Sequence, residues 1–158
     1  MLKMLRKYLH KINTIVQLYR VKKGKNTGVF GKITIINRSN LTLGKNCSLN
    51  HGVYINAFNR IKICDNVTLS AGVKVISTGI DVNSWANDKN RHISNEGVFI
   101  NNHCWIGANA IILPGVKITG EYVVIGAGGV VTKDISEGHC VYAGCPAKKV
   151  RDILEKEE

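Results

Sequence analysis

The amino-acid sequence predicts an all-β solenoid built from six-residue repeats. Aliphatic residues recur at every sixth position in the stretch INNHCWIGANAIILPGVKITG, residues 100–120, and this period fits neither an α-helix nor a single strand. Glycine, asparagine or aspartate often stands between them, as expected for corners. A period of six is typical of a parallel β-helix, in which each repeat gives one short strand whose aliphatic side chain stacks on its equivalents in neighbouring coils. Small or slim residues stand four positions after many of these aliphatics: Cys47, Val53, Ala71, Ser77, Cys104, Ala110, Val116 and Gly129.

Phased runs extend the repeat over residues 29–131. A first run is followed, after a two-residue slip, by an unbroken run from Leu43 to Val73. A third run starts at Ile100, and a one-residue slip precedes the last pair. Each coil buries its aliphatic residue only when other coils stack on it, so the runs together predict one continuous core. The repeating positions are Val29, Ile35 and Leu41; Leu43, Leu49, Ile55, Ile61, Val67 and Val73; Ile100, Ile106, Ile112 and Ile118; and Ile125 and Val131.

Residues 1–25 form a basic segment that precedes the repeats, and residues 2–20 are predicted to be an amphipathic helix. Apolar residues alternate steps of three and four from Leu2 to Tyr19, which lines one helical face. Two interpretations follow. In the favoured one, the helix packs as a cap on the body of the protein or on a neighbouring subunit; in the other, it rests on anionic lipid. No acidic residue precedes Asp65, whereas the cations of this segment are Lys3, Arg6, Lys7, Lys11, Arg20, Lys22, Lys23 and Lys25.

One insertion and one C-terminal element complete the predicted organisation. Residues 78–97 carry no repeat yet keep the phase on both sides, so they are expected to leave the solenoid as a loop, where function tends to lie. The charged residues after the last strand predict a short helix that covers the open end of the β-helix. The expected domains are the N-terminal helix, 1–25; the β-helix with its loop insertion 78–97, 26–145; and the C-terminal helix, 146–158.

The composition argues against several classes of protein. No apolar run of about 18 residues is present, so no membrane-spanning helix is predicted. The lysine-rich start lacks the apolar stretch and cleavage site of a signal peptide, and five cysteines without a C-x-x-C pair favour free thiols in a reducing cytoplasm. The net charge of +11 raises nucleic-acid binding, but no nucleic-acid motif accompanies it, so no nucleic-acid partner is expected.

Three C-terminal stretches have a specific pattern: CWIGANAIILPGV at 104–116, VIGAGGVVTKDI at 124–135 and AGCPAKKVR at 143–151. Together with RIKICDNVTLSAGVKVISTG at 60–79, they resemble the hexapeptide-repeat acyltransferases, especially the maltose and galactoside acetyltransferases and the O-acetyltransferases of bacterial polysaccharide clusters. The resemblance covers about residues 40–152. It implies a left-handed parallel β-helix, a homotrimer with acetyl-CoA bound between subunits, and direct acetyl transfer without a covalent enzyme intermediate.

The resemblance also implies how acetyl-CoA, the co-substrate, is held. Small residues would lie along the pantetheine, where a larger side chain would block the groove. Lysine and arginine suit the nucleotide phosphates because they form charge-assisted hydrogen bonds, although a solvated surface charge is the alternative for each lysine. No metal is expected, since the histidine spacing does not suggest a cluster of ligands. The implied contacts are Ala108 and Ala127 at the pantetheine, Thr132 and Lys133 at the coenzyme, and Lys148 and Arg151 near the nucleotide phosphates.

The catalytic base cannot be carried over directly from the family. The resemblance implies a histidine that removes the acceptor proton, at the end of a Thr-Gly-His stretch. Ile80 occupies that position here and cannot accept a proton. His92, in the loop, is the preferred substitute, and His51 is the second candidate. The alternatives are an exposed loop histidine for His92 and an outward-facing strand residue for His51.

Three further residues are expected near the acceptor. Asn50 matches the asparagine that faces the acceptor in the sugar acetyltransferases, with a β-helix corner residue as the alternative. Asp81 is placed to orient a catalytic imidazole. Trp85 belongs to the same loop and is a candidate contact to the substrate.

The sequence therefore predicts a cytoplasmic, trimeric, acetyl-CoA-dependent O-acetyltransferase that acts on a saccharide, with a role in cell-surface polysaccharide biosynthesis. For a lipid-linked acceptor, residues 1–25 would bring the trimer to the anionic inner surface of the membrane. Two alternatives stay open. One is an N-acetyltransferase of an amino sugar nucleotide. The other is a non-catalytic β-helix scaffold, which Ile80 favours because the expected histidine is absent from its position.

Overall fold

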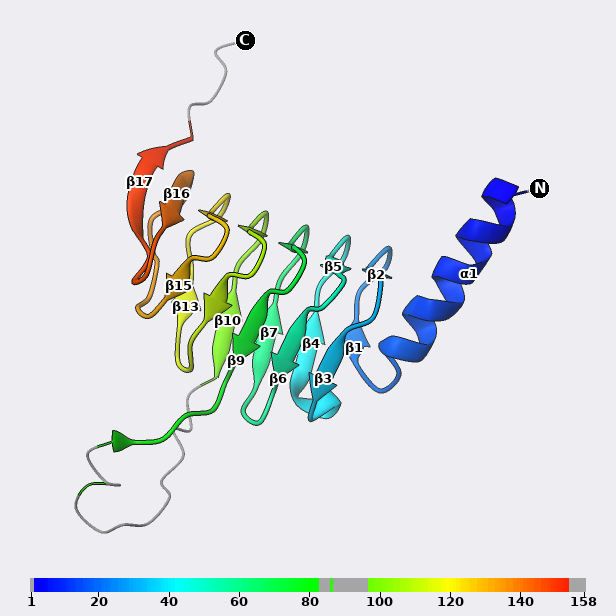
Figure 1. Cartoon of the computed structure of the whole chain (residues 1–158), viewed down its shortest axis with the longest axis horizontal. Helices are drawn as coiled ribbons and strands as arrows, with labels where there is room; N and C mark the ends of the chain where they lie inside the picture. Colours follow the sequence, from blue (N-terminus) through cyan, green and yellow to red (C-terminus); the bar gives the residue numbers. More distant parts are fainter. Residues whose placement is uncertain (1, 83–85, 87–96, 154–158) are drawn as a thin grey trace.

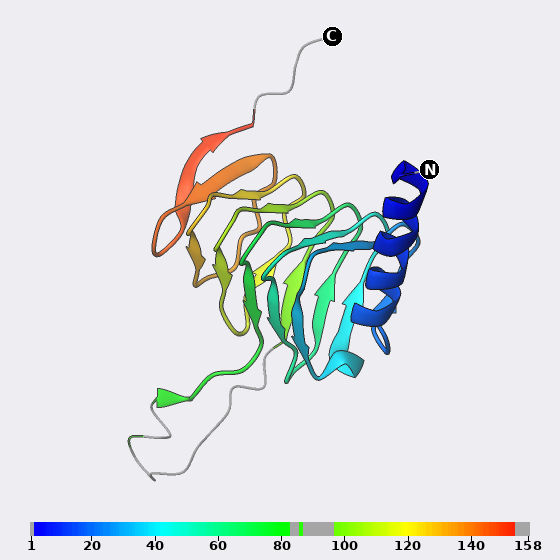
Figure 2. The same ribbon diagram turned by 45° about the vertical axis from the view of Figure 1, so that its right-hand side comes forward.

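Three parallel β-sheets form the faces of a solenoid of about five coils, and each coil gives one strand to each sheet (Figures 1 and 2). The computed structural model describes residues 2–82, 86 and 97–153. Sheet A contains β1 (Lys22–Lys23), β4 (Leu41–Leu43), β7 (Ile61–Ile63), β10 (Val98–Ile100) and β13 (Lys117–Ile118). Sheet B contains β2 (Gly28–Phe30), β5 (Ser48–Asn50), β8 (Thr68–Leu69), β11 (Trp105–Ile106), β14 (Val124–Ile125), β16 (Cys140–Ala143) and β17 (Lys148–Asp152). Sheet C contains β3 (Thr34–Ile36), β6 (Tyr54–Asn56), β9 (Lys74–Ile76), β12 (Ile111–Ile112) and β15 (Val130–Val131). The predicted parallel β-solenoid is confirmed.

Inward side chains lie over one another because neighbouring coils pair in register. In sheet B, for example, Leu49 pairs with Val29 on one side and with Leu69 on the other, and all three are buried. The inward side chains thus form one hydrophobic core, built from rows of aliphatic side chains along the axis of the stack. Each row is shielded from water only when a coil covers it on both sides. Every coil must therefore supply an aliphatic residue, which explains why the six-residue period can be recognised in the sequence.

The predicted unbroken run from Leu43 to Val73 is wrong in register. β7 lies beside β4 with Ile61 opposite Leu41 and Ile63 opposite Leu43, so two extra residues occupy the corner before β7. Both positions of these strands point inward and both are aliphatic, so Ile61 satisfies the six-residue period although it belongs to the other inward row. Every residue of the run is buried, as predicted.

The corner between sheets A and B holds a column of side chains that stack from coil to coil. All of its residues have a φ between 53° and 59°, the left-handed region that asparagine tolerates better than most residues. Asn46 Nδ2 donates to Asn66 Oδ1 at 3.0 Å, and the rings of His103 and Tyr122 stack with centroids 4.4 Å apart. His103 therefore has a structural role. The column consists of Asn26, Asn46, Asn66, His103, Tyr122 and His139.

Helix α1 (Leu2–Gln17) caps the first coil with its polar side (Figure 1). The amide of Val29 in β2 donates to Thr14 Oγ1 at 3.0 Å, and Asn13 Nδ2 donates to the carbonyl of Val29 at 3.0 Å. The helix lies on the body of the protein through polar side chains, because the apolar stripe faces away from the coil and is exposed; packing on a neighbouring subunit stays a prediction. In the part of the chain that the structure describes, no helix is long and apolar enough to cross a bilayer.

The expected C-terminal helix, 146–158, is not formed where the structure describes it. After the turn at Pro146 the chain returns as β17, which pairs antiparallel with β16 and extends sheet B. The open edge of β16 offers unpaired backbone groups, and their pairing outweighs the helix propensity of the lysines and arginine of this segment. Residues 154–158 lie outside the described residues.

The loop insertion leaves the solenoid after β9, and β10 re-enters in phase, as predicted (Figure 1). The pairing of Ile100 with Ile63 shows that the inward row continues across the gap. The buried Ser77 anchors the exit, because its hydroxyl donates to the carbonyl of Asn56 and accepts from the amide of Asn59, each at 2.9 Å. Only residues 78–82, 86 and 97 of this loop are described.

Candidate functional site

One edge of the solenoid, where sheet B turns into sheet C, brings four of the predicted site residues together. Asn50 and His51 lie on it in the second coil, Ala108 in the fourth and Ala127 in the fifth. Ala71 occupies the same position in the third coil, and it is exposed. We call the column His51, Ala71, Ala108 and Ala127 the His51 edge. Its successive coils are tied by amide-to-carbonyl bonds from Gly72 to His51 (2.9 Å), Asn109 to Ala71 (2.9 Å) and Gly128 to Ala108 (2.8 Å).

The spacing of the coils fixes the length of this edge. Adjacent strands lie about 4.8 Å apart, so His51 stands about 14 Å from Ala127 along the stack. Ala71, Ala108 and Ala127 present only methyl side chains at this edge beyond His51. An extended chain can lie along it with the imidazole of His51 at one end.

His51 is exposed, and its imidazole lies against Gly31 of the first coil. A Cβ at Gly31 would stand 2.7 Å from His51 Cβ and 3.1 Å from its Nδ1, so only glycine leaves the ring its place. Asn50 is half-buried, and its Nδ2 donates to the carbonyl of Leu69 at 3.0 Å. This bond supports the corner role of Asn50, because it ties the second coil to the third.

The last coil places cations at the other end of the His51 edge. The turn over residues 144–147 sits on β15, since the amide of Val130 donates to the carbonyl of Gly144 (2.9 Å) and the amide of Ala147 donates to that of Val130 (2.8 Å). Lys148 starts β17 opposite Ala143, next to the turn. Arg151 is opposite Val141, farther along the same strand, and both cations are exposed.

A second edge, where sheet C turns into sheet A, holds two of the other predicted residues. Thr132 and Lys133 are exposed at this edge in the fifth coil. Ile80 and Asp81, both exposed, follow β9 of the third coil, in the segment that leaves the solenoid. A single chain therefore does not bring these residues to His51, because the width of sheet C separates the two edges. His92 and Trp85 lie outside the described residues.

Burial and pairing shift the pKa of several groups near the C-terminus. Burial raises the pKa of the Cys104 thiol to about 11, so the group is a neutral core residue near neutral pH. Lys149 bonds Glu137 at 2.6 Å and Asp152 at 2.7 Å. The hydrogen bonds to Asp152 and Glu137 raise the pKa of Lys149, and the bond to Lys149 lowers that of Asp152. Glu137, Cys140 and Asp152 lie close enough to suggest a metal site, but the Lys149 ammonium already bonds both carboxylates and offsets one of their two charges.

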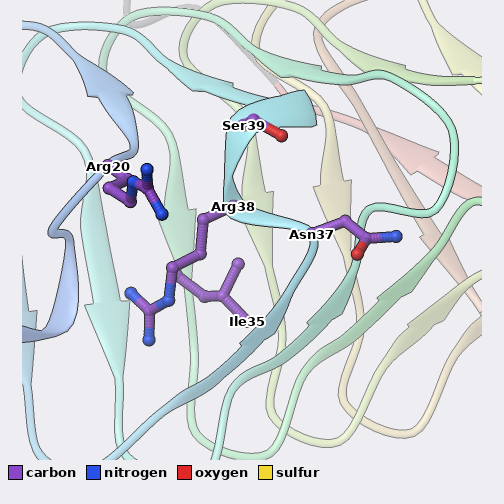
Figure 3. Close-up of a pocket in the computed structure, with 5 residues that line it drawn as sticks. All are labelled: Arg20, Ile35, Asn37, Arg38 and Ser39. Carbon is purple, nitrogen blue, oxygen red and sulfur yellow. The ribbon is translucent and has the colours of Figure 1, made fainter.

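Sequence reasoning missed a pocket at the opposite end of the molecule. It has a volume of about 500 Å³ and lies at the first coil, where η1 (Arg38–Asn40) follows β3 (Figure 3). Two arginines that are 18 positions apart in the sequence line this pocket, so no local sequence motif predicts it. The lining residues are Arg20, Ile35, Asn37, Arg38 and Ser39.

Comparison with known proteins identifies relatives with this geometry. A family model described as the hexapeptide repeat of succinyl-transferase matches residues 97–133. The crystal structure of a maltose O-acetyltransferase from Clostridium difficile 630 matches with a TM-score of 0.79 and 31% sequence identity, over 87% of this chain and 73% of that chain. The chain belongs to the hexapeptide-repeat acyltransferase family. The motifs at 104–116 and 124–135 overlap the matched region, so the sequence-based assignment to the family is confirmed.

This hexapeptide-repeat acyltransferase chain is also similar to galactoside acetyltransferases. A solved galactoside acetyltransferase in complex with coenzyme A matches with a TM-score of 0.75 and 34% identity, over 84% of this chain and 65% of that chain. The galactoside O-acetyltransferase of Escherichia coli K12 is 34% identical over 135 residues, or 85% of this chain. The chain spans 65% of the length of that curated relative, less than two thirds.

Proposed function

We propose that this protein is an acetyl-CoA-dependent O-acetyltransferase that acts on a hydroxyl of a saccharide. The observation that carries the proposal is the His51 edge, with a histidine at one end, three alanines along it and cations beyond the fifth coil. Two relatives support it, because one is a solved galactoside acetyltransferase with coenzyme A and another is named a maltose O-acetyltransferase. We take the same donor and a saccharide acceptor for this chain.

The coenzyme is proposed to run along the His51 edge. Its phosphates lie near Lys148 and Arg151, where cations supply charge-assisted hydrogen bonds. Its pantetheine arm passes Ala127 and Ala108, whose methyl groups leave the surface low. The thioester then reaches Ala71, one coil from His51.

A homotrimer completes the site in this proposal. Subunits related by a three-fold axis meet through two different surfaces, so one edge of each chain faces another edge of its neighbour. The His51 edge of one subunit then adjoins the second edge of the next, which carries Thr132 and Lys133, and the segment with Asp81. This arrangement gives these residues a place in the same site, although the width of sheet C separates them within one chain.

His51 is the proposed base, and His92 is the alternative. The acceptor hydroxyl oxygen attacks the thioester carbonyl carbon while His51 takes the hydroxyl proton. The C–S bond then breaks, the acetyl group stays on the acceptor oxygen, and the imidazolium returns its proton to the CoA thiolate. His51 is preferred because it belongs to the same edge as the alanines and is adjacent to Asn50, which is proposed to face the acceptor.

The acceptor is proposed to be a precursor of a cell-surface polysaccharide, with the reaction on the cytoplasmic side of the membrane. Galactosides and maltose are the acceptors to test first, because the relatives are named for them. Acetylation of an amino sugar nucleotide, with little transfer to either saccharide, would replace the O-acetyltransferase proposal by the N-acetyltransferase alternative.

Calorimetric titration with CoA tests the proposed donor site. One CoA per chain is expected, with a Kd of about 10–100 μM that weakens as salt rises. Lys148→Gln is expected to weaken binding, whereas Lys45→Gln, at an exposed corner between sheets A and B, leaves it unchanged. No CoA binding by the folded protein would overturn the proposal.

Turnover, measured as CoA release, separates the enzyme from a scaffold and tests the base. His51→Ala is expected to lower kcat by about 10²–10⁴-fold without changing CoA affinity. The same loss with His92→Ala alone would move the base to the loop. CoA binding with no transfer to any saccharide or amino sugar would favour the scaffold, consistent with Ile80 at the family's histidine position.

A further inference from the structure

The side of α1 that faces the solenoid is polar, and its side chains complete the backbone bonds of the first coil. Thr14 and Asn13 bond Val29, as described above. Gln17 Oε1 accepts from the amide of Ile33 at 2.7 Å, and Gln17 Nε2 donates to the carbonyl of Gly31 at 2.6 Å. These bonds fix the rotation of the helix, because they satisfy the exposed edge of β2 from one face only.

The opposite side of α1 is apolar and open to water. Its side chains are between 41% and 78% exposed, although they are large aliphatic or aromatic groups. A continuous exposed apolar surface of this kind is uncommon unless it meets a partner. We call it, together with Tyr19 just after the helix, the outer helix face, and it consists of Met4 (78%), Leu5 (52%), Tyr8 (64%), Leu9 (55%), Ile12 (41%), Ile15 (56%), Val16 (65%) and Tyr19 (69%).

The charge around the outer helix face selects the kind of partner. Eight of the 22 lysines and arginines fall in residues 1–25, and all 11 acidic residues fall at or after Asp65. A second copy meeting this face through its own helix would bring the four cations of that helix against it, with four more in the residues up to Lys25. The remainder of the chain has 14 lysines and arginines against 11 acids, a net charge of +3, so its composition does not favour it as the partner of this basic segment. A surface that is both apolar and anionic fits, and a bilayer with anionic phospholipids has both properties.

The first-coil pocket adds a place for a phosphate group at the end of the helix. Arg20 lies three residues after α1, and Arg38 Nη1 donates to the carbonyl of Gln17, the last residue of the helix. Figure 3 shows both guanidinium groups on the same side of the segment that carries Ile35 and Asn37, and Ser39 also lines the pocket. Guanidinium groups bind phosphate through charge-assisted, paired hydrogen bonds.

We propose that the outer helix face and the Arg20–Arg38 pocket dock this protein on the surface of a bilayer that contains anionic phospholipids. The helix lies in the plane of the interface, with its apolar side chains among the acyl chains and the two arginines at headgroup phosphates. This proposal does not depend on acetyltransferase activity.

Docking has a consequence for the proposed reaction, which rests on the proposed function. Helix α1 lies at one end of the solenoid and β17 at the other (Figure 1). The bilayer would therefore meet the end near His51, while Lys148 and the coenzyme stay in solution. A lipid-linked acceptor would approach the base from the membrane side.

Flotation of the full-length protein with vesicles tests the docking surface. Vesicles of phosphatidylcholine with phosphatidylglycerol are compared with vesicles of phosphatidylcholine alone. We expect binding to the anionic vesicles that weakens as salt rises. Joint replacement L9S and I12S is expected to lower partitioning by at least about tenfold for each side chain. V150S, which removes a 63% exposed aliphatic side chain of β17 at the other end of the solenoid, is the matched control and should leave binding unchanged.

The charged part of the surface has its own variants. R20Q is expected to weaken binding to the anionic vesicles several-fold, whereas K117Q, at an exposed position of sheet A in the fifth coil, is not. Binding that is equal for R20Q and K117Q would remove the phosphate site. Equal binding of the wild type and the L9S/I12S variant would overturn the docking surface. A change of oligomeric state in L9S/I12S, without vesicle binding by the wild type, would assign the face to subunit contact instead and equally overturn the proposal.

A third measurement avoids any loss of folding. Y8W keeps the outer helix face apolar and reports its environment through tryptophan emission. A blue shift with the anionic vesicles is expected, because the indole leaves water for the interface. Emission that does not move at protein and lipid concentrations that give flotation would contradict burial of this face.

Discussion

Truncation of Ile112 tests how much one inward row contributes to the free energy of unfolding of the solenoid. It is fully buried in β12, with Val75 of β9 on one side and Val131 of β15 on the other. Ile112→Ala withdraws buried methyl and methylene groups worth about 2.4 kcal/mol at roughly 0.8 kcal/mol each. The cavity left behind adds about 1 kcal/mol, because rows held from both sides relax little. The free energy of unfolding is therefore expected to fall by about 3–4 kcal/mol.

Urea unfolding followed by circular dichroism, at one fixed protein concentration, gives this change. Ile112→Val should cost about 1 kcal/mol. Ile36→Ala makes the same chemical deletion at a side chain that is 40% exposed, so it should cost at most about 1.4 kcal/mol. A loss below about 1.5 kcal/mol for Ile112→Ala, or a loss equal to that of Ile36→Ala, would refute the claim that the inward rows carry the stability of the fold.

Three further predictions concern the C-terminal half. Ala127→Trp should lower CoA affinity at least about tenfold with an unchanged melting temperature, measured by calorimetry and thermal unfolding; unchanged affinity would exclude the His51 edge as the groove. A thiol reagent near neutral pH should label the exposed Cys145 rapidly and Cys104 only after unfolding, because burial raises the pKa of Cys104 to about 11; Cys145→Ser should remove the rapid phase, and labelling of Cys104 at a comparable rate would contradict its burial. The pKa of Asp152 is lowered, so its pair with Lys149 stabilises the fold above about pH 4, and this stabilisation is lost as pH falls. The pKa of Lys149 is raised, so the stabilisation persists through about pH 10 and is lost at higher pH. The difference in melting temperature between wild type and Lys149→Met should therefore be flat from about pH 5 to 10 and shrink on both sides, and a constant difference below pH 4 would contradict the pairing.

The period of six made the solenoid predictable because inward burial alone determines it. Each coil must bury an aliphatic residue against its neighbours, so an aliphatic residue is required in every repeat. The register was harder to predict, because two inward rows run in parallel and Ile61 fits the period of either. Only the pairing of β7 with β4 shows which row it joins.

The C-terminal element was mispredicted for a different reason. Lysine, arginine and aspartate over residues 148–152 suit a surface helix, and nothing local in that stretch indicates that the edge of β16 is open. The strand forms because backbone pairing with a distant segment outweighs local propensity. Edge pairing of this kind depends on the last coil and not on the segment itself.

The position of some candidate site residues could be predicted from the repeat, while their roles stay predictions. The equivalence of Ala108 and Ala127 follows from the repeat, and the structure adds Ala71 and His51 to the same edge. The sequence could not reveal that Thr132 and Lys133 occupy another edge. That separation is set by how the chain turns at each corner, and it is what makes the proposed site depend on a second subunit.

The amphipathic helix shows why an apolar stripe does not identify its own partner. The alternation of threes and fours is the same whether the stripe meets a core, a subunit or a bilayer. The polar face of α1 determines the orientation of the helix here, because Asn13, Thr14 and Gln17 must point inward to bond the free edge of the first coil. Once these polar side chains are fixed, the apolar stripe has to point outward, and the cations of residues 1–25 then determine which outside surface suits it.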